Sequence, residues 1–345
     1  MSADDPAPPT LLPEPVPMPR VRLAVAAFAA GLLLPFAPAL AQPGPATKAH
    51  TALVHGVALS PDGKTLATAG FDNTIKLWSV GADGSLKELK VLTGHTGPVY
   101  AVAFHPKEKL LASASHDKTA KIWTLDDGKV KTELKGHTDI VDAIVFSPDG
   151  SAVATAGADK SVRLWNPADG KETKNLGSHA GSVYAVVFSP DGKLLASAGG
   201  DNSSKTMKEH VVKLWDVAAG KEAKTLTGHD LPVTAITFAG DAKTLVSASM
   251  DRTIRFWDTA AGKETKKLGP TPDDPYALAW DAKSKALGVC GYSGLLSVYP
   301  AGADKAAFTA AVKSPGYCVI FSADGKALIS GHDNGSVVVT KITVK

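Results

Sequence analysis

The stretch Gly94–Trp123 reads GHTGPVYAVAFHPKEKLLASASHDKTAKIW, and its pattern recurs through most of the chain. The next copy, GHTDIVDAIVFSPDGSAVATAGADKSVRLW, occupies Gly136–Trp165. Each copy opens with Gly-His, passes through two apolar runs separated by a turn, and ends with an Asp six residues before a Trp. His95, His137 and His179 follow one another at intervals of 42 residues. A fixed period near 40 residues indicates a repeat architecture.

Within one copy, the residue types indicate strands. The runs 99–104, 110–115 and 119–123 are rich in Val, Ala, Ile, Phe and Trp and are separated by turn residues, as is typical of antiparallel strands. A fourth, weaker run, Val130–Leu134, precedes the next histidine. Because one four-stranded sheet cannot bury both of its faces, the copies are expected to stack radially. The predicted fold class is all-β, a single seven-bladed β-propeller of four-stranded antiparallel blades.

These motifs resemble those of the WD-repeat β-propeller family, in a secreted bacterial-type form. The Gly-His pair, the Ser-Pro-Asp-Gly turn and the Asp recur in order over about residues 50–345. Trp215-Asp216 and Trp257-Asp258 keep the family's closing dipeptide, which drifts to Trp78-Ser79, Trp123-Thr124 and Trp165-Asn166 in other copies. The resemblance implies a propeller whose central channel has a mouth where partners commonly dock.

The composition limits the kinds of chemistry. With 345 residues, 44% of them apolar, and a net charge of +3, the chain has enough apolar residues for a large core and lacks the charge typical of a nucleic-acid partner. Its two cysteines, Cys290 and Cys318, align with alanines of other copies, so we expect small buried thiols. They fall in adjacent predicted blades, which leaves a disulfide as the alternative.

The first 41 residues predict an export signal. Residues 1–17 are Pro-rich, so we expect them to be disordered and to lie upstream of the true start at Met18. Residues 18–41 combine two arginines, an uncharged apolar run and the small-x-small site Ala39-Leu40-Ala41, as secretory signal peptides do. Cleavage there leaves residues 42–345 as a periplasmic or secreted propeller without stable membrane insertion. The alternative is an uncleaved signal that anchors the chain in a membrane.

The units differ in regularity. Unit four carries a polar insertion within Asn202–His210, which we expect to form an enlarged loop on the side of the channel mouth. Unit six has Ser293 and Tyr299 in place of the Asp and the Trp, and unit seven keeps Asp333 but lacks the His and the Trp. Because the chain ends after the third strand of unit seven, we expect Pro45–His50 to supply the missing strand and close the ring.

Five units carry a His, a Ser or Thr, an Asp and a Trp in the same order. These residues are His50, Thr68, Asp72, Trp78; His95, Ser113, Asp117, Trp123; His137, Thr155, Asp159, Trp165; His179, Ser197, Asp201, Trp215; and His229, Ser247, Asp251, Trp257. A hydrolase needs one exposed, activated nucleophile, so repetition in five units favours a structural role. The family resemblance implies a buried hydrogen-bonded chain ending at the Trp indole. Units six and seven lack it, and we expect them to be the least stable.

A second pattern concentrates aromatic residues at two positions of the unit. The first position lies four residues before the end of the first strand and holds His55, Tyr100, Asp142, Tyr184, Thr234, Tyr276 and Tyr317. The second precedes the Asp and holds Phe71, His116, Ala158, Gly200, Met250, Tyr292 and His332. The resemblance places both sets around the channel mouth. We predict that all of them except Asp142, Ala158, Gly200 and Thr234 contact a partner. The alternative is that the tyrosines only pack between blades.

These observations favour a monomeric, non-enzymatic scaffold that binds a protein or peptide and carries no cofactor. The sequence shows no Gly-rich phosphate loop in a strand–helix context and no metal-binding Cys cluster. The main alternative is an enzyme or metal-binding propeller, in which His55, His116 and His332 converge on one ion. A third possibility is a purely structural repeat array in an envelope assembly.

Overall fold

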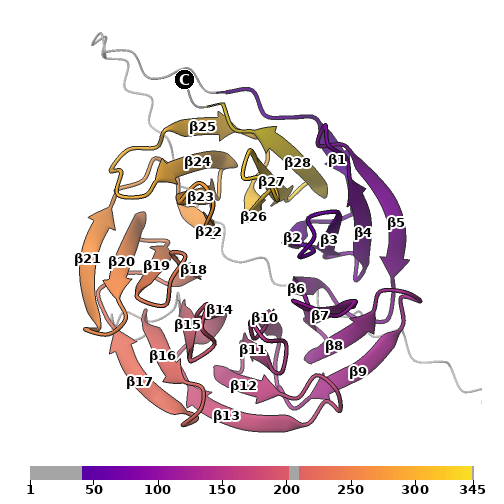
Figure 1. Cartoon of the computed structure of the whole chain (residues 1–345), viewed down its shortest axis with the longest axis vertical. Coiled ribbons are helices and arrows are strands. Elements are labelled where there is room, and N and C mark those ends of the chain that lie inside the picture. The colour runs from indigo at the N-terminus through magenta and orange to yellow at the C-terminus, as the bar shows by residue number, and fades with distance from the viewer. Residues whose placement is uncertain (1–40, 202–209, 344–345) are drawn as a thin grey trace, which may run out of the picture. The chain divides into compact units, whose positions relative to one another are not determined.

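Seven antiparallel sheets, each of four strands, surround a central channel in the computed structural model (Figure 1). The structure describes residues 41–201 and 210–343, which belong to one unit, Leu40–Lys345. The predicted Pro-rich segment 1–17, the signal peptide up to residue 40, and residues 202–209 of the predicted enlarged loop lie outside the described residues. The prediction of an all-β, seven-bladed propeller is confirmed.

Each blade has four strands, counted here from the channel outward. The first strands are β2 (Val54–Leu59), β6 (Val99–Phe104), β10 (Val141–Phe146), β14 (Ser182–Phe188), β18 (Val233–Phe238), β22 (Pro275–Asp281) and β26 (Gly316–Phe321). The second strands are β3 (Thr65–Gly70), β7 (Leu110–Ser115), β11 (Val153–Gly157), β15 (Leu194–Gly200), β19 (Thr244–Ser249), β23 (Ala286–Gly291) and β27 (Ala327–His332).

The third strand of each blade is largely buried, whereas most of the fourth strands are exposed along much of their length. The third strands are β4 (Ile75–Val80), β8 (Thr119–Thr124), β12 (Ser161–Trp165), β16 (Val212–Asp216), β20 (Thr253–Asp258), β24 (Leu295–Pro300) and β28 (Ser336–Lys341). The fourth strands are β5 (Leu86–Leu92), β9 (Val130–Lys135), β13 (Glu172–Ser178), β17 (Lys221–Leu226), β21 (Lys263–Leu268), β25 (Phe308–Ala311) and, for blade seven, β1 (Ala46–Lys48).

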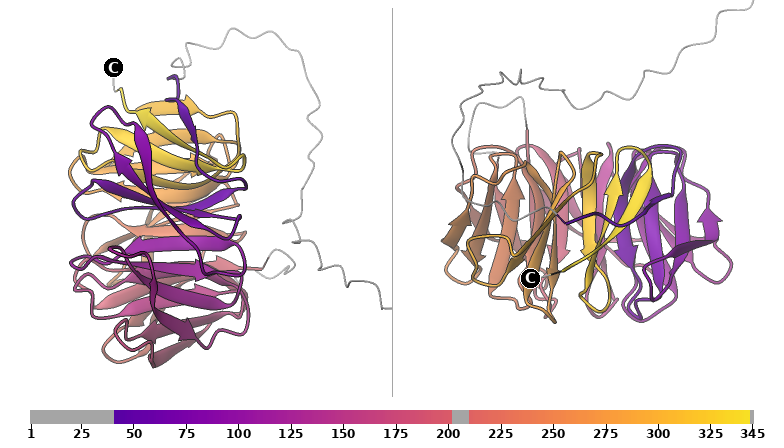
Figure 2. Two further views of the ribbon diagram at one scale, coloured as in Figure 1. Left: turned by 90° about the vertical axis from the view of Figure 1, so that its right-hand side faces the viewer. Right: turned by 90° about the horizontal axis from the view of Figure 1, so that it is seen from above.

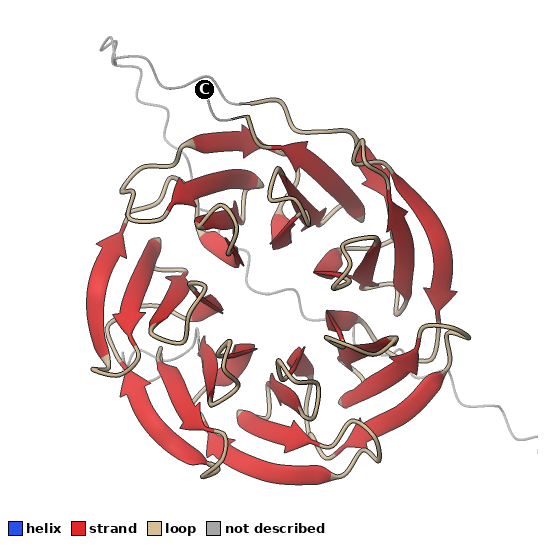
Figure 3. Cartoon of the chain, in the orientation of Figure 1, coloured by secondary structure: helices blue, strands red, loops and turns tan. Residues whose placement is uncertain are grey.

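The strands run between two faces of the ring, which Figure 2 shows edge-on. Because the strands alternate in direction, the loops between blades and the turns joining second to third strands share one face, here called the channel-mouth face. The other turns lie on the opposite face. Figure 3 shows strands and loops in the part of the chain that the structure describes, where no helix is long and apolar enough to cross a membrane.

The hydrophobic core lies between neighbouring blades. One cluster joins Leu77 and Leu92 of blade one to Val99, Leu111 and Trp123 of blade two, and the same kind of contact recurs around the ring. The second strands are buried on both faces, so they consist largely of small residues, as in LLASAS of β7. Each blade therefore depends on both neighbours to bury its apolar side chains.

The ring closes through the two ends of the described chain. Strand β1 pairs antiparallel with β28, with Ala46 opposite Val338 and Lys48 opposite Ser336, and Figure 1 shows the indigo strand beside the yellow one. The prediction that a segment near Pro45–His50 completes blade seven is confirmed. The chain before β1 continues to blade six, where the Ala41 N–H donates to the carbonyl oxygen of Thr309 (2.9 Å).

Both cysteines are buried free thiols, and they form no disulfide with each other. Cys290 lies in β23 of blade six and Cys318 in β26 of blade seven. Burial raises the pKa of Cys290 well above its usual value and that of Cys318 to about 12. Because the thiolate is the reactive form, neither side chain is suited to nucleophilic chemistry.

Candidate functional site

The repeated His, Ser, Asp and Trp form one hydrogen-bonded chain inside blade two. The Trp123 indole N–H donates to Ser113 Oγ (2.8 Å), Ser113 Oγ lies 2.7 Å from His95 Nε2, and His95 Nδ1 lies 2.7 Å from Asp117 Oδ2. Since the indole only donates, the Ser113 hydroxyl donates to Nε2 and the Nδ1–H donates to the carboxylate. Asp117 also accepts from Thr119 N (3.0 Å) and so caps the turn between β7 and β8.

The same chain occurs in blades one, three and five. The distances from His Nε2 to the hydroxyl oxygen of Thr68, Thr155 or Ser247 are all 2.7 Å. In blade two, burial alone would raise the pKa of Asp117, but the hydrogen bonds from His95 and Thr119 hold it well below its usual value. The hydroxyl, imidazole and carboxylate are thus fully engaged with one another, which leaves no free nucleophile in these sets.

Blade four keeps only part of the chain. Ser197 Oγ lies 2.7 Å from both His179 Nε2 and Trp215 Nε1, as in the regular blades. Nδ1 of His179 is buried and has no hydrogen-bond partner among the described residues. Burial lowers the pKa of this imidazole to about 3. The difference coincides with the insertion after Asp201, the residue that stands where the other four blades have the histidine's carboxylate partner.

The channel-mouth residues of the first predicted position share one backbone feature. In every blade, the pairing of the first and second strands skips one residue, for example between Val99 and Ala101 in β6, and the skipped residue is a β-bulge. The bulged residues are His55, Tyr100, Asp142, Tyr184, Thr234, Tyr276 and Tyr317. A bulge leaves a residue outside the ladder and redirects its side chain. The seven side chains therefore form a ring, here called the bulge ring, near the start of the innermost strands.

Six aromatic side chains from four blades form one connected cluster at the channel mouth, here called the aromatic arc. Its members are His55, Phe71, Tyr100, Tyr276, Tyr292 and Tyr317, from blades one, two, six and seven. The ring centroids of His55 and Tyr100 are 4.9 Å apart, and those of Tyr276 and Tyr317 are 5.1 Å apart. Tyr292 lies at the outer edge and is 45% exposed.

Hydrogen bonds between blades fix two members of the bulge ring. His55 Nδ1–H donates to the carbonyl oxygen of Tyr100 (2.9 Å), and Thr234 Oγ1 donates to the carbonyl oxygen of Pro275 (2.9 Å). Burial lowers the pKa of His55 to about 4, so this imidazole is neutral at physiological pH. His55 is therefore an aromatic packing residue of the arc rather than a cation.

Asp142 is the one carboxylate in the bulge ring. Its Oδ2 is buried and has no hydrogen-bond partner in the described part of the chain. Burial, with smaller contributions from Asp139 and Asp159, raises the pKa of Asp142 to about 8. Burial and the charge of Asp142 also raise the pKa of Tyr100 and of Tyr184. The two tyrosines flank Asp142 in the ring, on β6 and β14.

The second predicted position needs one correction, in blade seven. His332 does not lie at the channel mouth: it is fully buried, its Nε2 lies 2.8 Å from Ser330 Oγ, and its Nδ1–H donates to the carbonyl oxygen of Ser314 (3.1 Å). The strand pairing aligns Ser330 with Ser113 of blade two, which makes Asn334 the equivalent of Asp117 and Asp333 the channel-mouth residue. Asn334 accordingly accepts from Ser336 N (3.0 Å) in the same turn.

This correction also removes the basis for a three-histidine metal site. Both ring nitrogens of His332 and the Nδ1 of His55 are engaged with protein groups. Within residues 41–201 and 210–343, no group of three or more His, Cys, Asp or Glu is arranged to hold a metal ion. His116 is exposed on the channel-mouth face by itself.

The remaining predicted contact residues lie outside the aromatic arc. Tyr184 and Met250 are partly buried in blades four and five. The sequence pattern missed Leu231, which is 44% exposed in the loop before β18. The Met250 N–H donates to the carbonyl oxygen of Pro232, the residue after Leu231, so this loop lies against the turn that carries Met250 (3.1 Å). The missed signal was a large apolar residue at a loop position that holds Ala52, Gly97, Asp139 and Gly181 in the first four blades.

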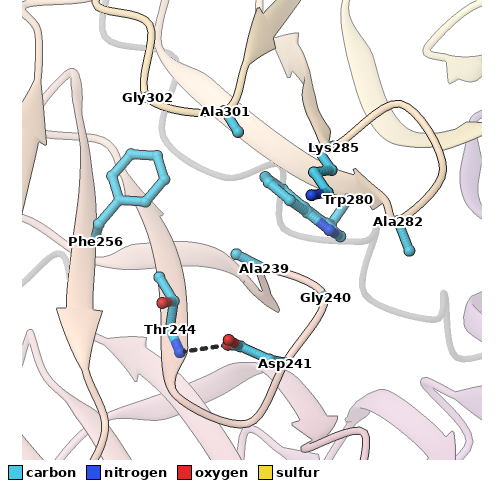
Figure 4. Close-up of a pocket in the computed structure, with 10 residues that line it drawn as sticks. All are labelled: Ala239, Gly240, Asp241, Thr244, Phe256, Trp280, Ala282, Lys285, Ala301 and Gly302. Atoms are coloured by element: carbon cyan, nitrogen blue, oxygen red, sulfur yellow. Dashed lines mark hydrogen bonds between the residues drawn. The ribbon is translucent and has the colours of Figure 1, made fainter.

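A separate cavity of about 460 Å³ lies on the opposite face, between blades five and six (Figure 4). Phe256 and Trp280 line it from neighbouring blades, and Asp241 accepts from Thr244 N (3.0 Å) at its edge. It opens where Gly240, with a φ of 79°, stands in place of the proline of the Ser-Pro-Asp-Gly turn. None of the predicted partner-contacting residues lines this cavity.

The sequence model of one family matches the chain. It is described as WD domain, G-beta repeat, and it matches residues 43–79, 86–124, 128–166, 170–216 and 220–258. Each matched segment begins at or near the outer strand of one blade and ends with the third strand of the next, so the sequence repeat is one strand out of phase with the blade. Blade six and the first three strands of blade seven lie beyond the matched segments. No curated protein sequence matches the chain.

Proposed function

The chain belongs to the WD40 repeat family, and from this premise we propose that it is a non-enzymatic scaffold that binds a protein or peptide at its channel-mouth face. Propellers of this family commonly mediate protein interactions. The observation that carries the proposal for this face is the bulge ring, because seven equivalent bulges direct side chains to one site and four of those side chains are tyrosines.

The exposed residues of the same face support the proposal. Tyr292 of blade six and Leu231 of the loop before blade five are 45% and 44% exposed, and the partly buried Tyr184 and Met250 lie in blades four and five. Aromatic residues and Met are enriched where proteins bind one another, since they bring a large contact area at a low entropic cost. The buried, mutually bonded His–Ser/Thr–Asp sets argue for a scaffold rather than a hydrolase.

We further propose that the protein is exported and acts as a monomer after removal of its signal peptide. The support is the sequence of residues 18–41, with its basic start, apolar centre and Ala-x-Ala exit. Mass spectrometry of the mature N-terminus tests this proposal. A chain that begins at residue 42 is the expected result, and a mature chain that retains residues 18–41 contradicts it.

Affinity capture with two matched surface variants tests the interaction function. The first variant, Leu231→Ala/Tyr292→Ala, truncates two exposed apolar side chains on the channel-mouth face. The control, Leu89→Ala/Val91→Ala, truncates two side chains on the outer strand β5 that are 56% and 40% exposed. A partner that the wild type and the control retain, and that the first variant loses by at least about tenfold, is the expected result. Equal capture by both variants contradicts the proposed face.

A further inference from the structure

The bulge ring contains a buried carboxyl oxygen that has no hydrogen-bond partner within the described chain. Asp142 Oδ2 is buried and lacks a hydrogen-bond partner, whereas His55 and Thr234 of the same ring each donate to a carbonyl oxygen of the next blade. A buried polar atom without a partner costs about 1–3 kcal/mol, so such an atom calls for an explanation. A ligand that supplies a donor here would remove that cost.

The surroundings of Asp142 favour a positive charge over a neutral donor. Tyr100 and Tyr184 flank it in the ring, and the charge of Asp142 reaches the hydroxyl of Tyr276 across the channel. The faces of aromatic rings attract ammonium and guanidinium groups, most strongly where water is excluded. Blades three and four carry Asp142 and Tyr184 at the first channel-mouth position. At the second position they carry Ala158 and Gly200, the smallest residues found there in any blade.

The charges at the channel mouth have one sign. The fourteen residues of the bulge ring and of the corrected second position include two carboxylates, Asp142 and Asp333, and no Lys or Arg, although the chain has 37 Lys and Arg in all. Three basic residues in the turns of this face form hydrogen bonds with other loops. Lys118, Lys160 and Arg252 each donate to a carbonyl oxygen of a neighbouring loop.

We propose that the channel mouth binds one cationic side chain, a lysine or an arginine of the partner, with its charged group against Asp142 and among Tyr100, Tyr184 and Tyr276. This inference rests on the proposed function, of which it specifies the chemistry. The aromatic arc then supplies contact area, and Asp142 supplies the preference for charge.

Binding would be coupled to proton release. The pKa of Asp142 is about 8 in the free protein, because of burial and the carboxylates Asp139 and Asp159, so the side chain is mostly protonated at pH 6.5. Tyr100, Tyr184 and Tyr276 face it with raised pKa values and stay neutral. A cation next to Asp142 favours the carboxylate and displaces its proton to solvent. Affinity should therefore rise as the pH increases toward 8.

Titration of the full chain with n-butylammonium chloride, followed by calorimetry and by proton release at pH 6.5, tests the inference. We expect n-butylammonium and n-butylguanidinium to bind with release of up to about one proton, and the uncharged 1-butanol to bind at least about tenfold more weakly. Asp142→Asn keeps the shape of the side chain and should weaken cation binding at least about tenfold and abolish proton release. Asp169→Asn changes an exposed carboxylate in the turn between β12 and β13, on the opposite face of the same blade, and is the matched control that should bind as the wild type does.

The outcomes separate this inference from the proposed function. No binding of either cation, equal binding of 1-butanol, or equal binding by Asp142→Asn overturns the cation site. A captured partner that Asp142→Asn retains as well as the wild type also overturns it, while leaving the interaction function in place. Cation binding that needs Asp142, with no partner captured in the experiment above, supports the cation site and contradicts the interaction function.

Discussion

Blade two and blade six have the same four-stranded arrangement but different residues at the positions of the polar chain. In blade two the hydroxyl of Ser113 joins His95 to Trp123. In blade six, Val289 stands at the position of Ser113 and Tyr299 at that of Trp123, and both are buried. Val289 has no polar group, and the Tyr299 hydroxyl interacts with Ser297, so the polar chain is lost without leaving a polar group unsatisfied. The strand pattern, rather than the polar chain, is what forms a blade.

In blade six a carboxylate still links the turn to the preceding loop, although the rest of the polar chain is lost. In blade two, Asp117 precedes β8 and accepts from Thr119 N and from Thr96 N of the preceding loop. In blade six the carboxylate has moved to that preceding loop, where Asp273 accepts from Ser293 N (2.9 Å) and Ser293 Oγ (2.7 Å). Blades two and six therefore share the link between the loop and the turn, and the carboxylate that forms this link can come from either side.

Removing β1 is the change with the largest expected effect, since blade seven is the one blade whose outer strand comes from the other end of the described chain. Deletion of residues 41–48 unpairs the outer edge of β28 and uncovers Val337 and Val338, which are fully buried. We expect a loss of at least about 3 kcal/mol in the free energy of unfolding. Differential scanning calorimetry measures it as a fall in Tm.

The control for this deletion is a chain that lacks residues 1–40 and keeps 41–48. Its Tm should match that of the full chain, which shows that any loss comes from residues 41–48. An unchanged Tm on deleting 41–48 would show that blade seven holds its shape with three strands. The ring would then be closed by the contacts of β2 with β26 and β27.

The polar chain itself is tested by one substitution made in two blades. Ser113→Ala in blade two leaves both His95 Nε2 and the Trp123 N–H without a partner, whereas Ser330→Ala in blade seven leaves only His332 Nε2. We expect costs of about 2–4 kcal/mol and about 1–2 kcal/mol in the free energy of unfolding. Urea titration of both variants measures the difference, and equal costs would contradict a contribution from the Trp123 hydrogen bond.

The fold was predictable because it depends on features that repeat. The 42-residue period and the strand runs identify the blades, and the missing last strand identifies the closure. The first channel-mouth position was counted correctly in every blade, because it lies within a strand whose end is marked by an apolar residue. No feature of the sequence marks the bulge, since Val99-Tyr100-Ala101 is an uninterrupted run of strand-forming residues. It arises from the way the two strands pair.

The errors at the site have physical reasons. In blade seven the closing Trp is absent, so the sequence pattern assigns Asp333 to the position of the repeated Asp, whereas the amide oxygen of Asn334 accepts the same turn hydrogen bonds. That shift by one residue moved His332 from the channel mouth to the interior of the blade. The state of Asp142 was also beyond prediction, because tyrosines from three other blades create its surroundings.

A third comparison concerns two histidines of the same repeat position as the pH is lowered. His137 Nδ1–H donates to Asp159 (2.8 Å), and that carboxylate partly offsets the lowering of the histidine's pKa by burial. His179 lacks such a partner among the described residues, and its pKa falls to about 3. In the unfolded chain both titrate near 6.5. Below that pH the unfolded state binds more protons than the folded state, so stability is lost as the pH falls from 6.5 toward 3.

His179→Gln removes this titration and should reduce the pH dependence of the free energy of unfolding between pH 6 and pH 4 by up to about 1.4 kcal/mol per pH unit. His137→Gln should reduce it by less, because Asp159 already favours the protonated form in the folded state. Urea titrations at several pH values compare the slopes, which separates the titration from the constant cost of each substitution. Equal slopes for the wild type and His179→Gln would show that the lone imidazole of blade four takes up its proton in the folded state as readily as in the unfolded chain.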